Sequence, residues 1–152
     1  MRSVRSLVVL WLPVLVWMAL IFAGSSDRAS FSHSSRILGP LIHWLFPQLS
    51  EEDTYRLVFT ARKVAHVTEY AVLALLVWRA RRRSGSGPAD GWAWRHACEA
   101  VWVAAFYAAA DEFHQTFVPS REGCIRDVLI DTAGAAVGLA LLWLLGRWRK
   151  CW

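Results

Sequence analysis

Cysteine is scarce in this sequence, and its few copies are scattered. The three cysteines, Cys98, Cys124 and Cys151, are odd in number and far apart. This spacing excludes a disulfide framework and a C-x-x-C metal pair, so we interpret each cysteine as a small apolar filler. The sequence also lacks an H-E-x-x-H motif and an internal repeat, which excludes the common zinc-protease pattern and repeat architectures.

A single basic patch is also missing. The formal net charge is +5, but the 17 Lys and Arg residues are distributed along the chain between apolar stretches. Nucleic-acid binding needs basic residues gathered on one face. We therefore expect no nucleic-acid partner.

Apolar residues are abundant instead. Hydrophobic residues make up 56% of the chain, mean hydropathy is +0.32, and there are ten tryptophans. A spanning helix needs roughly 20 mostly apolar residues, and four stretches come near that length: about 7–24, 61–79, 94–115 and 125–146. The sequence therefore predicts one all-α domain over residues 1–152, an integral membrane bundle of four transmembrane helices.

The first stretch, residues 7–24, also resembles a signal peptide, with a basic start, an apolar core and small residues at its end. However, its apolar run is longer than a usual signal core and contains Trp11, Pro13 and Trp17. We favour an uncleaved span, and the mass of the mature protein distinguishes the two.

Residues 25–60 mix apolar and polar side chains and are interrupted at Gly39-Pro40 and at Pro47. We expect short interfacial helices there, with Trp44 and Phe46 as anchors. Ser50, followed by three acidic residues, is a typical helix start. That helix either continues into 61–79 or kinks before it.

The distribution of basic residues predicts the orientation. With both termini in the cytoplasm, the inner side holds ten Lys and Arg against two acids, and the outer side holds seven against ten acids. The positive-inside rule favours this arrangement. Loop 80–93 is then cytoplasmic and segment 25–60 extracytoplasmic, in a multi-pass membrane protein.

Ionisable residues gather at the outer ends of three predicted spans. An ionisable group in hydrocarbon costs a few kcal/mol at least, so such groups pair and mark functional sites. On 125–146, two acids and two glycines follow one another at spacings of four, three and four, which places them on one helix face. The expected partners are the basic residues Lys63, Arg121 and Arg126 with the acids Glu69, Asp111, Glu112, Asp127 and Asp131.

Two segments, "KVAHVTEY" at 63–70 and "DEFHQTFVPSREGCIRDVLIDTAGAAVG" from Asp111 to Gly138, resemble the VanZ-like proteins. The resemblance covers most of the chain, with one departure, because Asp131 stands where the family usually has asparagine. It implies a small, four-span bacterial membrane protein. Some members are associated with low-level teicoplanin resistance, and no molecular activity comes with the family.

A polar site facing outward is our first hypothesis, with a lipid headgroup or a lipid-linked cell-wall precursor as its ligand. Lys63 and Arg121 would hold a phosphate, and His66 would shuttle a proton beside Glu69. The candidate ligand-binding residues are Lys63, Tyr70, Asp111, Glu112, Gln115 and Arg121. The candidate catalytic residues are His66, Glu69, Asp127 and Asp131.

Three other interpretations fit the same residues. A metal site would combine His66 and Glu69 with carboxylates or His114 around Zn²⁺, Mn²⁺ or Mg²⁺, although the spacing is not specific. A structural ion network would only lock the helices together. A transporter would need dimerisation, because four short spans leave little room for a pathway. Cofactor, oligomeric state and catalysis stay open.

Overall fold

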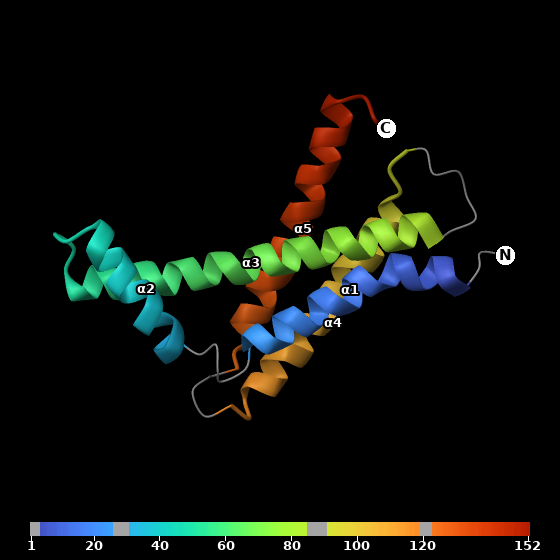
Figure 1. Ribbon diagram of the computed structural model, residues 1–152. Coiled ribbons are helices and arrows are strands. Elements are labelled where there is room, and N and C mark those ends of the chain that lie inside the picture. Colours follow the sequence, from blue (N-terminus) through green and yellow to red (C-terminus); the bar gives the residue numbers. More distant parts are fainter. Residues whose placement is uncertain (1–3, 26–30, 85–90, 119–122) are drawn as a thin grey trace.

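The computed structural model describes residues 4–25, 31–84, 91–118 and 123–152. Over these ranges the chain forms five α-helices and no strand (Figure 1). The helices are α1 (Val4–Ser25), α2 (Phe31–Leu45), α3 (Glu51–Ser84), α4 (Trp94–Gln115) and α5 (Ile125–Trp148). The all-helical class predicted from the sequence is thus confirmed.

Helix α3 is one uninterrupted helix of 34 residues. Its start follows the predicted pattern, because the backbone N–H of Asp53 donates to Ser50 Oγ at 3.1 Å and three acids occupy the first turn. At 1.5 Å per residue the helix is about 51 Å long, more than the roughly 30 Å of a bilayer core. The predicted stretch 61–79 is therefore only part of α3.

Helix α2 differs from what we expected for segment 25–60. The chain stays helical across Gly39 and Pro40, where we expected an interruption. Because α2 packs against α3, tertiary contacts hold the helix across a residue that normally breaks it. Trp44 and Phe46 lie on the exterior, with 76% and 49% of their surfaces exposed.

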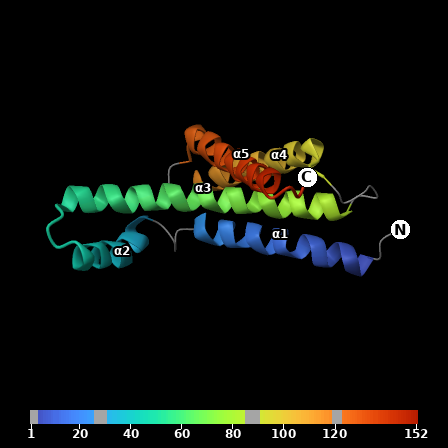
Figure 2. The same cartoon turned by 90° about the horizontal axis from the view of Figure 1, so that it is seen from above.

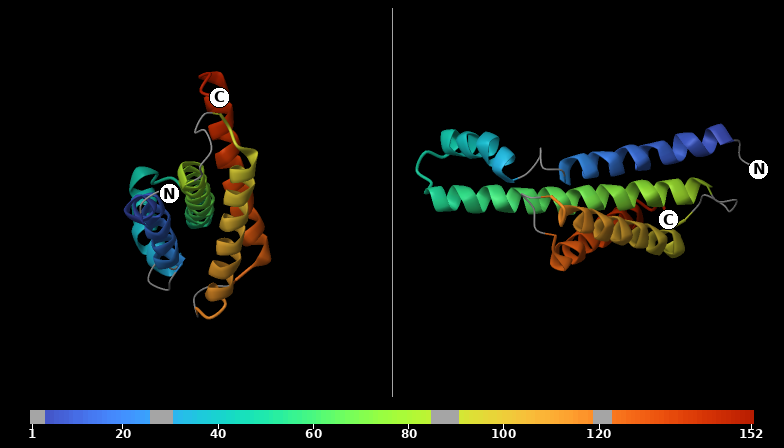
Figure 3. Two further views of the ribbon diagram at one scale, coloured as in Figure 1. Left: turned by 90° about the vertical axis from the view of Figure 1, so that its right-hand side faces the viewer. Right: turned by 90° about the horizontal axis from the view of Figure 1, so that it is seen from below.

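The helices form three layers with α3 in the middle. Figures 2 and 3 show α1 and α2 on one side of α3, and α4 and α5 on the other. Helix α3 contacts each of the other four helices. Buried residues of α3 can therefore contact residues of the other helices.

Small residues let these layers approach closely. Buried alanines line one face of α4 at helical spacing: Ala97, Ala100, Ala104 and Ala108. On α5, a Cβ added to Gly134 would lie 2.8 Å from the carbonyl oxygen of Val67, and one added to Gly138 would lie 2.8 Å from Cβ of Ala71. The two glycines therefore allow backbone contact between α5 and α3, as expected for small residues at helix interfaces in lipid.

Length and composition would let two of the described helices cross a membrane. These are α1, from Arg5, and α5. Helices α3 and α4 do not meet the same criterion, because charged residues interrupt their apolar stretches. The expectation of four spans is thus supported for two helices only. Along α1, large apolar side chains are more than a third exposed, as a lipid-facing helix requires: Leu7, Val8, Val9, Leu12, Leu15, Val16, Leu20 and Phe22.

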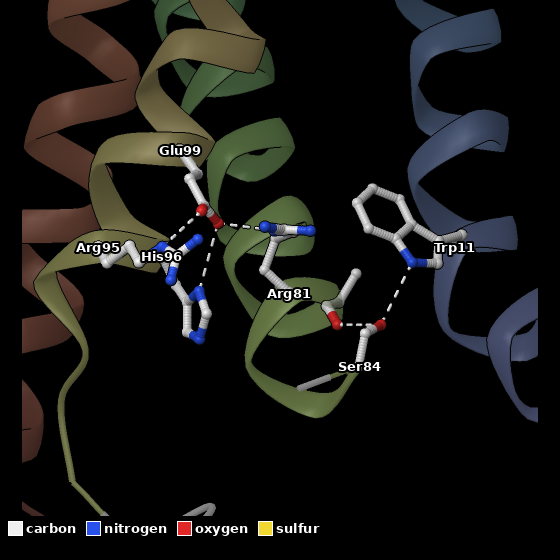
Figure 4. A network of polar contacts seen from close by, with 7 residues as sticks. Trp11, Arg81, Ser84, Arg95, His96 and Glu99 are labelled. Atoms are coloured by element: carbon white, nitrogen blue, oxygen red, sulfur yellow. Dashed lines mark hydrogen bonds and ion pairs between the residues drawn. The ribbon is translucent and has the colours of Figure 1, made fainter. Parts of the chain in front are cut away.

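Polar contacts tie the helices together where α3 ends and α4 begins (Figure 4). Glu99 of α4 accepts hydrogen bonds from Arg81 of α3 at 2.6 Å and from Arg95 at 3.2 Å, and it lies 3.3 Å from His96 Nδ1. Trp11 of α1 donates to Ser84 Oγ at 3.3 Å. We call this region the tryptophan end, because it also gathers the indoles of Trp78, Trp92, Trp94, Trp143 and Trp152.

Candidate functional site

The end of the bundle opposite the tryptophan end holds a group of ionisable and amide side chains from four helices. We call it the polar cluster, and it consists of Ser25, Lys63, Asp111, Glu112, Gln115, Asp127 and Asp131. Sequence analysis predicted that six of these seven residues would meet.

At the end of α4, a buried glutamine joins two acidic side chains. Gln115 Nε2 donates to Asp111 Oδ2 at 3.0 Å and to Glu112 Oε1 at 3.3 Å. Each of the three side chains is at most 7% exposed. Their spacings of three and four residues place them on one helix face, as predicted.

Helix α1 adds a hydroxyl to this group. Ser25 is fully buried, and its Oγ donates to Asp111 Oδ2 at 2.6 Å. A hydrogen bond to a charged carboxylate is stronger than one between neutral groups. The contact therefore fixes the end of α1 against the end of α4.

Lys63 of α3 forms an ion pair with Asp127 of α5. The two side chains are about a third and a quarter exposed, at 33% and 26%. The ammonium also lies 5.6 Å from the ring centroid of Phe59. Lys63 thus neutralises one carboxylate and joins the two helices that make the backbone contact at Gly134.

Glu112 links the end of α4 to the residue that precedes α5. Its Oε2 accepts the backbone N–H of Cys124 at 2.9 Å. A Cβ at Gly123 would lie 2.3 Å from the carbonyl oxygen of Glu112, so only glycine fits this approach. Asp131 is 3% exposed and lies one helical turn after Asp127 on α5. It interacts electrostatically with the charged residues of the cluster: Glu112, Asp127, Lys63 and Asp111.

Among the buried atoms in and beside the cluster that have no hydrogen-bond partner in the described part of the chain are the hydroxyl of Tyr70, which is 0% exposed, and Oδ1 of Asp111. Tyr70 interacts electrostatically with both Asp111 and Asp131, and its ring lies 6.4 Å from that of Tyr107. A buried polar group that is left unpaired costs roughly 1–3 kcal/mol. The two atoms are therefore candidates for contact with a ligand or water.

His66 and Glu69 lie on α3 between Lys63 and Tyr70. His66 Nδ1 is 3.5 Å from Glu69 Oε2, within ion-pair distance but longer than an ordinary hydrogen bond. The carbonyl of Glu69 accepts the indole N–H of Trp17 at 2.9 Å. Both side chains are partly exposed.

Two further predictions concern Arg121 and the metal site. Arg121 lies outside the described residues. Among the residues that the structure describes, no three His, Cys, Asp or Glu side chains are arranged to hold a metal ion. His114, a possible metal ligand by sequence, lies against Phe22 with ring centroids 4.5 Å apart. The metal interpretation therefore gains no support from the described part of the chain.

Sequence reasoning missed the contribution of α1. Besides Ser25, Trp17 reaches the backbone of Glu69, and the carbonyl of Met18 accepts the hydroxyl of Tyr107 at 2.5 Å. The only signal in the sequence was the "GSS" that ends the first apolar stretch. Serine is common at helix ends whether or not it contacts another helix, so this signal alone does not identify a cluster residue.

Comparison with known proteins identifies the family. The VanZ/LLP1 family model matches residues 10–146, nearly the whole chain. The chain belongs to the VanZ/LLP1 family. Searches of curated proteins and of solved structures gave no match. Membership of the VanZ/LLP1 family, together with the two apolar helices α1 and α5, indicates a membrane protein.

Proposed function

We propose that this VanZ/LLP1-family chain is a four-span bacterial membrane protein whose polar cluster binds the headgroup of a cell-envelope lipid or lipid-linked cell-wall precursor. In this proposal α1, α4, α5 and the later part of α3 cross the cytoplasmic membrane. The charges of α3 and α4 do not oppose this, because several of them are paired across helices, Lys63 with Asp127 and Arg81 with Glu99.

The orientation follows from charge. The tryptophan end is rich in arginine and would face the cytoplasm with both termini, while the polar cluster would lie under the extracytoplasmic face. Lipid headgroups and lipid-linked precursors present phosphates, hydroxyls and amines at that depth. Lys63, which pairs with Asp127, is the cation of the polar cluster, and Arg121 is its proposed partner in holding a phosphate.

One observation carries the proposal: among the described residues, the Tyr70 hydroxyl and Asp111 Oδ1 are buried without a hydrogen-bond partner, while Ser25 and Gln115 both donate to Asp111 Oδ2. A purely structural ion network would gain nothing by burying them. One donor and one acceptor suit the hydroxyl or amine of a bound headgroup. Tyr70, Asp111, Glu112 and Gln115 are therefore the proposed binding residues.

Catalysis on the bound headgroup is the second candidate, favoured by the His66–Glu69 contact at 3.5 Å. His66 would transfer a proton while Glu69 orients its ring, and Asp127 or Asp131 would act as base or orienter. We also propose that headgroup binding underlies a contribution to teicoplanin resistance, the property associated with some VanZ-like proteins.

Tyr70→Phe tests binding directly. The probes are a polyprenyl pyrophosphate that carries a disaccharide and plain polyprenyl phosphate, titrated onto the purified chain in detergent and measured by native mass spectrometry. We expect affinity for at least one probe to fall about tenfold, the value of one hydrogen bond to a buried partner. The free energy of unfolding should stay equal or rise, because the hydroxyl has no described partner.

Tyr55→Phe is the matched control, since Tyr55 lies on the same helix and is 57% exposed. It should leave affinity unchanged. If Tyr70→Phe binds every probe as the wild type does, or loses stability without losing affinity, the polar cluster is a structural network and the proposal is wrong. Measuring teicoplanin sensitivity of cells with the same variants tests the resistance role.

A further inference from the structure

The tryptophan end carries a second set of buried donors, on the opposite side of the proposed membrane from the polar cluster. We propose that Trp78, Trp92 and Arg82 form a binding site for the phosphate of an anionic phospholipid. The site does not depend on the function proposed for the polar cluster, because it uses other residues and the other leaflet.

Three indoles form a packed platform at this end. Trp78 and Trp92 stack with ring centroids 5.0 Å apart and an interplanar angle of 26°. Trp152 packs against both, at 6.1 and 5.4 Å, and its own Nε1 donates to the carbonyl of Trp143 at 3.2 Å. The third indole is thus satisfied by the backbone, and the first two are not.

The Nε1 atoms of Trp78 and Trp92 are buried and have no hydrogen-bond partner among the described residues. The whole side chain of Trp78 is only 6% exposed. A buried indole N–H usually finds an acceptor. Two unused N–H groups on stacked rings therefore indicate a ligand that supplies acceptors.

Arg82 places a cation over the same platform. Its guanidinium lies 5.2 Å from the ring centroid of Trp78 and 5.6 Å from that of Trp152, so cation–π attraction holds it there. Arginine and indole offer only donors. The ligand that matches such a set is anionic and rich in acceptor oxygens, and guanidinium geometry suits phosphate.

The charge of this end favours the same ligand. Glu99 is the only acidic side chain that the described residues place here, and Arg81, Arg95 and His96 already surround it (Figure 4). The other charged side chains that the described residues place at this end are positive: Arg5, Arg79, Arg82, Arg83, Arg147, Arg149 and Lys150. An anion would offset this excess.

The surroundings of the platform favour a lipid over a soluble phosphate. Large apolar side chains near this end are strongly exposed, among them Trp94 at 61%, Trp148 at 78% and Leu145 at 53%. Acyl chains would cover these side chains while the headgroup reaches the arginine. Tryptophan and arginine at one depth are also the usual composition of a membrane interface.

Native mass spectrometry of the full chain in detergent tests the site with phosphatidylglycerol, phosphatidylcholine of the same acyl chains, and inorganic phosphate as separate probes. We expect phosphatidylglycerol to bind well above phosphatidylcholine. Arg82→Ala should lower its affinity at least about tenfold. Arg83→Ala, which removes the same charge from an exposed neighbour, should lower it only about twofold.

Trp78→Phe keeps an aromatic ring but removes the N–H, and it should also weaken phosphatidylglycerol binding several-fold; it carries the test if Arg82→Ala does not fold. Equal losses for Arg82→Ala and Arg83→Ala would show general electrostatic attraction and overturn the site. So would equal binding of the two lipids. If inorganic phosphate alone displaces all bound phosphatidylglycerol at millimolar concentration, the assignment to a lipid is overturned.

Discussion

Gly134→Leu is expected to separate α5 from α3 and to lower the free energy of unfolding by about 3 kcal/mol, the upper part of the range for overpacked interfaces. Even a Cβ at this position would lie 2.8 Å from the carbonyl oxygen of Val67 and 3.1 Å from its Cα. Backbone atoms cannot rotate away as a side-chain terminus can. The two helices must therefore move apart, which also lengthens the Lys63–Asp127 contact.

Unfolding of the purified protein by SDS in mixed micelles measures this effect. Gly134→Ala should cost less, about 1 kcal/mol, and Ala133→Leu should cost at most about 0.5 kcal/mol, because Ala133 is exposed. Similar stabilities for Gly134→Leu and Ala133→Leu would mean that α5 does not contact α3 through its glycines.

Lys63→Glu is the second substitution with a large expected effect, a loss of about 3 kcal/mol. It removes the partner of Asp127 and adds an acid next to the buried carboxylates Glu112 and Asp131. The repulsion between like charges in a poorly solvated site is only weakly reduced by solvent. Combining it with Asp127→Lys restores an ion pair, and roughly half of the lost stability should return.

Arg56→Glu is the control for charge reversal on the same helix. Arg56 pairs with Glu52 at 2.6 Å, but both side chains are more than 70% exposed. Its reversal should therefore cost less than about 1 kcal/mol. If Lys63→Glu costs no more than Arg56→Glu, or if the double substitution restores nothing, the ion pair does not hold α3 and α5 together.

The helical class could be predicted from sequence because apolar runs of about 20 residues have the length and composition of membrane-spanning helices. The start of α3 was also predictable, since Ser50 and the acids after it satisfy backbone groups locally. Pro40 misled the prediction because α2 is stabilised by its contact with α3, which local sequence does not reveal.

The polar cluster could be predicted because these charges fall in proposed membrane segments, where a charge needs a partner. Lys63 and Asp127 pair in the structure, and Asp111, Glu112 and Gln115 share one buried face. Ser25 could not be predicted, because it becomes a cluster residue only through the three-dimensional position of α1 beside α4. Which charges neutralise one another likewise depends on helix packing, not on spacing.

Accessibility of two native cysteines tests the central claim, that the polar cluster lies under the extracytoplasmic face. Cys124 is exposed next to Glu112 at the cluster, and Cys151 is exposed at the opposite end. In a Cys98→Ser background, we predict that a membrane-impermeant maleimide modifies Cys124 in intact cells and Cys151 only after permeabilisation. Modification of Cys151 in intact cells, with Cys124 protected, would contradict the account.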